Sequence, residues 1–158
     1  LRMRFQDKLE NAVYLDEGVE GSFFNVEIVS NSNKNQLPFK LNLEIPRADA
    51  LGQERLKVVA YDLMVFLKSR IDDRNFPTFL VHDGAFHGIT RKTCTNVLNY
   101  MYHQSLKMQN FQYIVTFNED EIVDETNNAY GELDFDLENH IIVTYSDSPK
   151  GTIFKRFF

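Results

Sequence analysis

The sequence is short of four things, and each shortage argues against a class of protein. Its single cysteine, Cys94, cannot form an internal disulfide, which fits a reducing cytosol and predicts a cytoplasmic protein with a buried structural thiol. No apolar run reaches the roughly 18 residues of a membrane-spanning helix. Positive charge is scarce: the net charge of −6 argues against a surface evolved chiefly to bind DNA phosphates. No segment has the phosphate-binding pattern G-x-x-x-x-G-K-S/T, so any phosphate cradle must come from other sequence.

What is present suffices for one hydrophobic core. The chain has 158 residues, 43% of them hydrophobic and 13% aromatic, which predicts a single domain over residues 1–158. Apolar residues at helical spacing predict a helix over residues 1–15, interpreted as the end of a preceding helix or coiled coil. The rest of the domain, residues 22–158, follows a turn rich in glycine and acidic residues.

The periodicity along residues 22–158 predicts an α/β fold. We expect three layers, with parallel strands at the centre of the sheet and antiparallel hairpins at its edges. The predicted elements are a hairpin of strands 23–29 and 39–45, a helix 52–70, a buried strand 78–82, a helix from the cap Thr90 to about 108, a buried strand 111–117, and strands 139–145 and 151–158.

Two polar residues follow the predicted parallel strands, where ligands of such sheets usually bind. Asp83 comes directly after an apolar strand, the position of a carboxylate that holds Mg²⁺ in nucleotide hydrolases, although an aspartate there also commonly caps a turn. Asn118 follows the second strand. Upstream, Gly52 opens a helix and would let backbone N–H groups approach an anion, whereas Glu54 also suits an ordinary helix start.

Three segments in order resemble the signature helix, Walker B strand and switch strand of ABC-type ATPases. They are ALGQER at 50–55, FLVHDG at 79–84 and QYIVTFN at 112–118. The sequence is most similar to the C-terminal domain of bacterial SMC-like ATPases of ABC-three-component systems, over roughly residues 40–158, including Tyr61-Asp62-Leu63 and the end GTIFKRFF. The resemblance implies the C-terminal lobe of an ATPase head, which binds ATP and Mg²⁺ only when complete.

The resemblance also implies roles for particular residues. Asp83 would be the Walker B carboxylate at the Mg²⁺ site, and Asn118 would occupy the switch position. Residues 85–88 would form the D-loop, where His87 could approach nucleotide or water because histidine titrates near neutral pH. Asp62 has no assigned role beyond a buried hydrogen bond.

The start of the second helix would contact ATP held by a partner protomer. The resemblance implies that Gly52, Gln53 and Glu54 face the γ-phosphate, while Arg55 supports the helix start. Two departures put fast hydrolysis in doubt: Gly84 stands where the ABC pattern has its catalytic glutamate, and Ala50 replaces the signature serine.

The implied partners are the N-terminal Walker A half of the same protein and a second head in a homodimer. Accessory proteins of the same operon and nucleic acid are further candidates, in DNA repair or defence, and no membrane is expected. A first alternative function is a nucleotide-independent interaction or dimerisation module that keeps a degenerate ATPase fold. A second is a metal-dependent nuclease.

Other patterns favour structural interpretations. The acidic run with Asp134 and Asp136 suggests a two-metal nuclease together with Asp83, but a solvated acidic loop suits its flanking residues better. His82 is expected to be buried in its strand, and the scattered histidines do not predict a transition-metal site. The aromatic tail of residues 154–158 could stack on bases, but core packing of a terminal strand is the preferred explanation.

Overall fold

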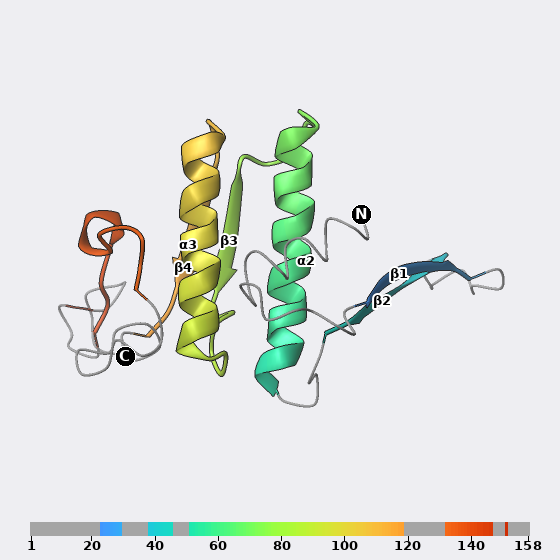
Figure 1. Cartoon of the computed structure of the whole chain (residues 1–158), viewed down its shortest axis with the longest axis horizontal. Coiled ribbons are helices and arrows are strands. Elements are labelled where there is room, and N and C mark those ends of the chain that lie inside the picture. Colours follow the sequence, from blue (N-terminus) through green and yellow to red (C-terminus); the bar gives the residue numbers. More distant parts are fainter. Residues whose placement is uncertain (1–22, 30–37, 46–50, 119–131, 147–150, 152–158) are drawn as a thin grey trace.

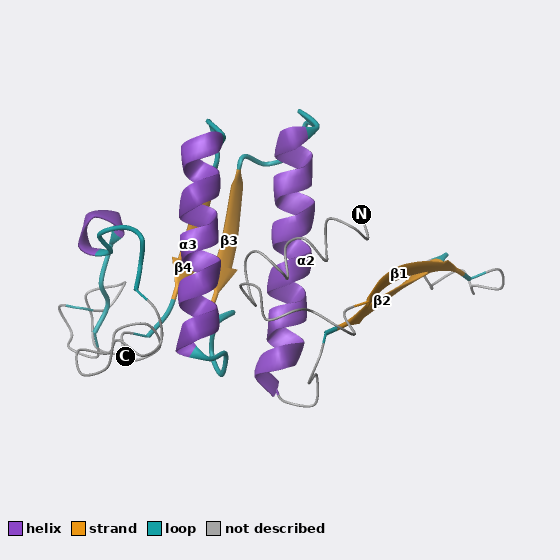
Figure 2. Cartoon of the chain, in the orientation of Figure 1, coloured by secondary structure: helices purple, strands orange, loops and turns teal. Residues whose placement is uncertain are grey.

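The computed structural model describes residues 23–29, 38–45, 51–118, 132–146 and 151 (Figure 1). This part of the chain forms an α/β fold with two helices and two separate two-stranded sheets (Figure 2). Its elements are β1 (Phe23–Ile28), β2 (Phe39–Glu44), α2 (Leu51–Ile71), β3 (Phe79–Asp83), α3 (Arg91–Lys107), β4 (Gln112–Thr116) and the 3-10 turn η3 (Glu138–His140).

The two helices bury the faces that their apolar spacing predicts. Every predicted core position of both helices is at most 6% exposed, which confirms the helical periodicity. Thr90 caps α3, because its hydroxyl oxygen accepts a bond of 3.4 Å from the Thr93 amide, as predicted. The buried positions are Leu56, Val59, Ala60, Leu63, Phe66 and Leu67 on α2, and Cys94, Val97, Leu98 and Met101 on α3.

β3 and β4 pair in parallel, with Asp83 opposite Thr116 at their carboxyl ends. Alternate residues of the two strands, among them Leu80, His82 and Tyr113, face the core formed by α2 and α3. The other face carries exposed apolar side chains, including Val81 at 47% and Ile114 at 36%. The prediction of fully buried strands is therefore wrong for this face, since the described residues cover only the side toward the helices.

The antiparallel hairpin of β1 and β2 confirms the predicted hairpin and extends away from the two helices in Figure 1. Phe24 is its buried residue, 4% exposed, with its ring 6.3 Å from that of Tyr61 on α2. Val26 and Ile28 on the same strand are 44% and 86% exposed. The hairpin is thus fastened to the core mainly at one end of its inner side.

Residues 132–146 pack beside α3 without forming a strand. Leu133 and Phe135 pack against the core, and Asn99 of α3 bonds the backbone of Glu132 and Asp134 at 2.8 Å each. The predicted strand 139–145 is wrong: its first residues belong to η3, and Ile142 is 88% exposed. An extended segment becomes a strand only by pairing, and no described strand pairs with it.

Several predictions fall on residues outside the described part of the chain. They are the helix 1–15, the loop after β1, Ala50, the acidic stretch after Asn118, and the strand 151–158 beyond Gly151. The α/β class holds for the residues described, whereas the three-layer ABC lobe stays a prediction.

Among the described residues, no helix is long and apolar enough to cross a membrane.

Candidate functional site

Asp83 lies exposed at the carboxyl end of β3, where the sequence places it. Its carboxylate accepts a hydrogen bond from the Thr116 hydroxyl, one strand across. The same hydroxyl oxygen accepts a bond of 3.0 Å from the Gly84 amide. Thr116 therefore fixes both the carboxylate and the first peptide of the following loop, and it leaves the second carboxylate oxygen for another ligand.

The loop after Asp83 is short and anchored in the core. Phe86, 1% exposed, is its buried side chain, while the Ile89 amide bonds the Phe86 carbonyl at 2.9 Å. Gly84 and Gly88 have φ angles of 59° and 79°, a left-handed conformation that costs glycine little. The loop thus turns back against the helix layer instead of continuing along the strand.

The start of α2 touches this loop directly. A Cβ added to Gly52 would lie 2.1 Å from the Gly88 carbonyl oxygen, so no side chain fits there without backbone movement. Three residues later, the Arg55 guanidinium donates a bond of 2.7 Å to the His87 carbonyl and lies 3.5 Å from the Gly84 carbonyl. Residues 52–55 and 84–88, far apart in sequence, therefore form one surface beside Asp83.

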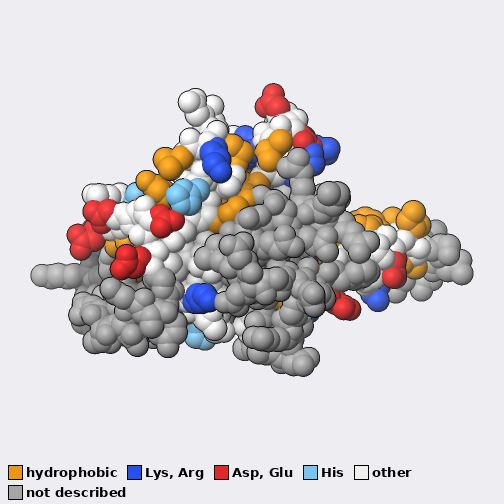
Figure 3. All heavy atoms as spheres, viewed as in Figure 1, with side chains coloured by type: hydrophobic (Ala, Val, Ile, Leu, Met, Phe, Trp, Pro, Cys, Tyr) orange, Lys and Arg blue, Asp and Glu red, His pale blue; other side chains and the backbone are white. Residues whose placement is uncertain are grey.

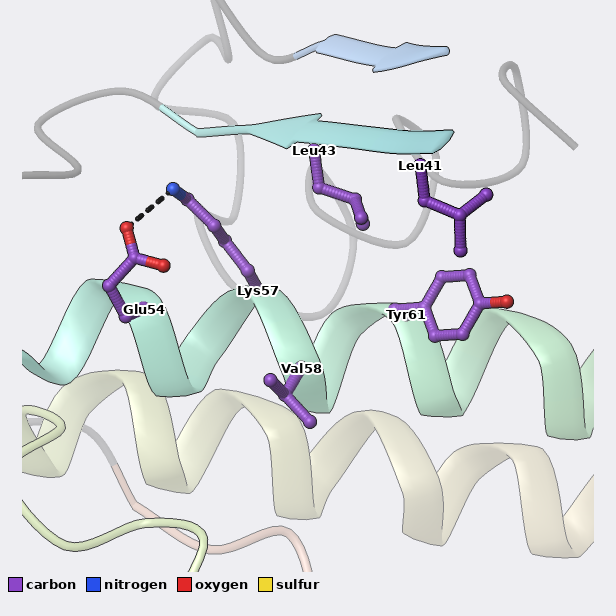
Figure 4. A pocket seen from close by; sticks show the side chains of 6 residues that line it. All are labelled: Leu41, Leu43, Glu54, Lys57, Val58 and Tyr61. Carbon is purple, nitrogen blue, oxygen red and sulfur yellow. Dashed lines mark hydrogen bonds and ion pairs between the residues drawn. The ribbon is translucent and has the colours of Figure 1, made fainter. Parts of the chain in front are cut away.

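Glu54 turns to another side of α2. Its carboxylate pairs with Lys57 at 2.7 Å, at the rim of a hollow of about 280 Å³ between α2 and β2 (Figure 4). Leu41 and Leu43 of β2 close the hollow opposite Tyr61. Successive helix residues point about 100° apart, which explains why Glu54 does not accompany Arg55.

The other predicted site residues lie near the same edge. Gln53 is in the first turn of α2, and its side chain is outside the described part. The side chain of His87 is exposed, as the loop prediction requires, and its carbonyl holds Arg55. Asn118 follows β4 by two residues and is exposed, on the edge where Asp83 and Thr116 end their strands. The structure thus brings Gly52, Arg55, His87 and Asp83 into one region.

A buried polar cluster lies directly behind Asp83. His82 is 4% exposed, which confirms its predicted burial, and its Nδ1 is 2.8 Å from the Tyr113 hydroxyl. Its Nε2 is 3.4 Å from Asp62 Oδ2 on α2. Burial lowers the pKa of His82 below 6.5, an effect that the Asp62 carboxylate opposes. Burial also raises the pKa of Tyr113, and nearby Cys94 and Asp62 raise it further, so the phenol stays protonated.

The acidic segment after residue 131 gathers negative charge at one end of the molecule (Figure 3). Asp134 pairs with His103 Nε2 at 2.7 Å, and Asp136 accepts bonds of 3.1 and 2.7 Å from Glu138 and Asn139. No three metal-ligating side chains come together among the described residues. The two aspartates thus serve local contacts of an exposed loop, as the solvated-loop interpretation predicts.

Two residues of the site were not singled out from the sequence. Thr116 orients Asp83, and Phe86 anchors the loop. Parallel register is the signal for Thr116, because equal counting along 79–83 and 112–116 places it opposite Asp83. Phe86 is the one aromatic side chain of a short loop with two glycines, a weak signal of an inward anchor.

The residues at this edge suit Mg²⁺ bound together with a nucleotide. Magnesium usually keeps several waters and uses one or two carboxylates plus substrate phosphates, so the single carboxylate of Asp83 is enough for its protein side. The carboxylate is exposed, and the Thr116 hydroxyl orients it. These residues therefore fit a hydrated cation shared with phosphates and do not form an all-protein metal cage.

Comparison with known proteins places the chain in a family. No curated protein and no solved structure matches it. A family model described as an uncharacterised protein conserved in bacteria (DUF2326) matches residues 9–158, nearly the whole chain. The chain therefore belongs to this bacterial family, DUF2326.

Proposed function

We propose that this chain is the C-terminal lobe of an SMC-like, ABC-type ATPase head. In this role, it supplies a signature-type helix start and the Walker B-type Asp83 for ATP-dependent dimerisation of heads. The observation that carries the proposal is the contact between the start of α2 and the loop after Asp83, where Gly52 lies against Gly88 and Arg55 bonds the His87 carbonyl. In the proposed arrangement, this surface faces ATP and Mg²⁺ held by a partner head.

The exposed outer face of the β3–β4 sheet supports the proposal that this lobe packs against a second half of the head. Parallel sheets are nearly always covered on both faces, yet Phe79 and Val81 are 53% and 47% exposed here. Since the sequence has no phosphate-binding loop, the missing half would be the one that carries it. An N-terminal Walker A half of the same protein meets both needs.

The proposed site binds and orients rather than activates water. Asp83 would hold a water of the Mg²⁺ shell, with its rotamer fixed by Thr116. Gly84 carries no side chain that could act as a general base, and Asn118 is neutral. We therefore expect slow hydrolysis, with ATP acting mainly as a bridge between heads.

The test is ATP-dependent dimerisation of the full-length natural protein, measured by light scattering with Mg²⁺. Asp83→Asn should weaken dimerisation by tenfold or more, because a neutral amide removes the charge that attracts the hydrated cation. The amide oxygen still accepts the Thr116 bond, so the melting temperature should hardly change. Arg55→Ala should also weaken dimerisation, through loss of the bond to the His87 carbonyl.

Matched controls separate this role from general damage. Asp134→Asn removes an equal charge from the exposed acidic segment, and Arg74→Ala removes an exposed arginine at the far end of α2. Both controls should dimerise like the wild type. Dimerisation that Asp83→Asn and Arg55→Ala leave unchanged would overturn the role assignment, and Mg²⁺-dependent DNA cleavage abolished by Asp134→Asn would favour the nuclease instead.

Exposed apolar side chains favour one second candidate, a nucleotide-independent interaction module. Val26 and Ile28 on the hairpin, with Val81 on the sheet, form surface that a partner protein could cover. Association of the 158-residue chain in nucleotide-free buffer, weakened by Val81→Asp, would support this candidate. A monomer at all concentrations would count against it.

A further inference from the structure

Three elements meet behind Asp83 through polar side chains. Asp62 comes from the middle of α2, His82 from β3 and Tyr113 from β4. His82 is 4% exposed, and buried polar atoms are expensive unless they are hydrogen-bonded. A polar residue in the middle of this core needs a reason, since an apolar residue of similar size would pack there at lower cost.

The chemistry of the groups fixes the direction of the bonds. The Asp62 carboxylate can only accept hydrogen bonds, so the neutral His82 ring, whose Nε2 lies 3.4 Å from Asp62 Oδ2, carries its proton on Nε2. Nδ1 is then the acceptor, and the protonated Tyr113 hydroxyl donates to it at 2.8 Å. At 3.4 Å the second contact is not an ordinary hydrogen bond, and Nε2 has no hydrogen-bond partner among the described residues. Among the described residues, the Asp62 carboxylate is therefore the acceptor that lies near this buried N–H.

The polar cluster of Asp62, His82 and Tyr113 lies where it can hold β3 in place but cannot take part in a reaction. The His82 ring is buried between Phe86 and Tyr113, with ring centroids 6.3 and 5.5 Å away. Asp83, the next residue, points to the opposite side of the strand and is exposed. A movement of His82 therefore moves the carboxylate, although His82 itself cannot touch nucleotide.

Two polar side-chain contacts join α2 to β3 and to the loop after it. Arg55 fastens its first turn to the loop carbonyls, and Asp62 contacts His82 two turns later. The two residues are about 10 Å apart along a rigid helix, at about 1.5 Å per residue. Two separated contacts fix the direction of the helix as well as its position, which one contact cannot do.

We propose that His82 is a positioning residue that holds Asp83 in place relative to the start of α2 through its contacts with Asp62 and Tyr113. Its consequence for ATP binding rests on the proposed function. In that setting, the helix start that meets a partner's phosphates and the carboxylate that meets Mg²⁺ move as one body. The role of Asp62 is then to join the helix to the strand.

The first experiment detects the contact between His82 and Asp62 by NMR, in the 158-residue chain without nucleotide. Two-bond ¹H–¹⁵N spectra should show His82 as a neutral ring with its proton on Nε2. Asp62→Asn should shift the amide resonances of Gly84 and Thr116, whereas Val58→Ala, on the exposed side of the same helix, should leave them in place. A proton on Nδ1, or unshifted resonances in Asp62→Asn, would overturn the proposal whatever the chain's function.

The second experiment measures ATP-dependent dimerisation of the full-length natural protein. The double variant His82→Leu/Tyr113→Phe removes both buried polar groups, so its melting temperature should stay within about 3 °C of the wild type. Its dimerisation should weaken about tenfold, and His82→Gln, whose amide can reach Asp62, should recover part of the loss. Unchanged dimerisation in the folded double variant would contradict positioning.

The two experiments separate failure of this inference from failure of the proposed function. If the wild type does not dimerise with ATP but Asp62→Asn shifts Gly84 and Thr116, the proposed function fails and the positioning contact stands. If dimerisation depends on Asp83 but not on Asp62 or His82, the proposed function stands and the positioning role is wrong.

Discussion

The two faces of the β3–β4 sheet differ in how far the described residues cover them. The inner face, with His82 and Tyr113, packs against the core of α2 and α3 and carries a hydrogen-bonded polar cluster. The outer face carries the exposed apolar side chains of Val81 and Ile114 beside the polar strand ends. Both follow from the same two strands, because alternate residues point to opposite sides. The contrast shows that the two strands are covered on the side of the helices and not on the other side, among the residues described.

The largest loss of stability should come from a cavity in the core that covers the inner face of the sheet. Leu63→Ala removes a side chain that is 1% exposed and should lower the free energy of unfolding by about 2–5 kcal/mol. Val81→Ala on the outer face should cost less than about 1 kcal/mol, since Val81 is 47% exposed. Urea unfolding of the 158-residue chain measures both. Equal losses would mean that the outer face is also covered.

Gly52→Ala tests the contact between α2 and the loop after Asp83. The added Cβ would lie 2.1 Å from the Gly88 carbonyl oxygen, so the backbone must shift, at a cost of about 1–3 kcal/mol. Thermal unfolding should show the loss, and Val58→Ala on the exposed side of α2 is the control. A stabilised Gly52→Ala, as expected for an ordinary exposed helix position, would mean that the contact is absent.

Substitutions of Gly84 test whether the same loop needs a left-handed backbone at a position with open space around it. A Cβ there meets nothing within 4 Å, but the φ of 59° is unfavourable for other residues. Gly84→Ala should therefore cost about 1 kcal/mol, and Gly84→Asn should cost less, because asparagine tolerates this conformation. Denaturant midpoints of the two variants provide the comparison. A cost for asparagine equal to that for alanine would point to crowding instead of backbone strain.

The smallest effect should be the pH dependence due to His82. Burial lowers its folded pKa below the ordinary 6.5, so the unfolded chain binds the proton more readily. Stability should fall as the pH drops below about 6.5, and the loss should level off below the folded pKa. Comparing unfolding of the wild type with His82→Gln between pH 7.5 and about 5 isolates this contribution, and parallel curves would contradict it.

Much of the fold was predictable because it depends on local patterns. The helical spacing of α2 and α3, the cap Thr90 and the β1–β2 hairpin are all confirmed. The strand 139–145 was wrong because its apolar run, Ile141 to Val143, shows β propensity, whereas pairing decides whether a strand forms. Of the site, the sequence predicts the positions of Asp83 and Gly52, but not that Arg55 bonds loop carbonyls or that Glu54 turns away.

By itself, the sequence determined the order and type of the main elements, the burial of His82 and Cys94, and the place of Asp83 at a strand end. These follow from periodicity and from the alternation of side chains, which act over a few residues. Only the tertiary structure decided that Gly52 touches Gly88, that Thr116 holds Asp83, and that Asp62 meets His82. Contacts between residues some 20 to 36 positions apart depend on how helices and strands pack, which no local pattern specifies.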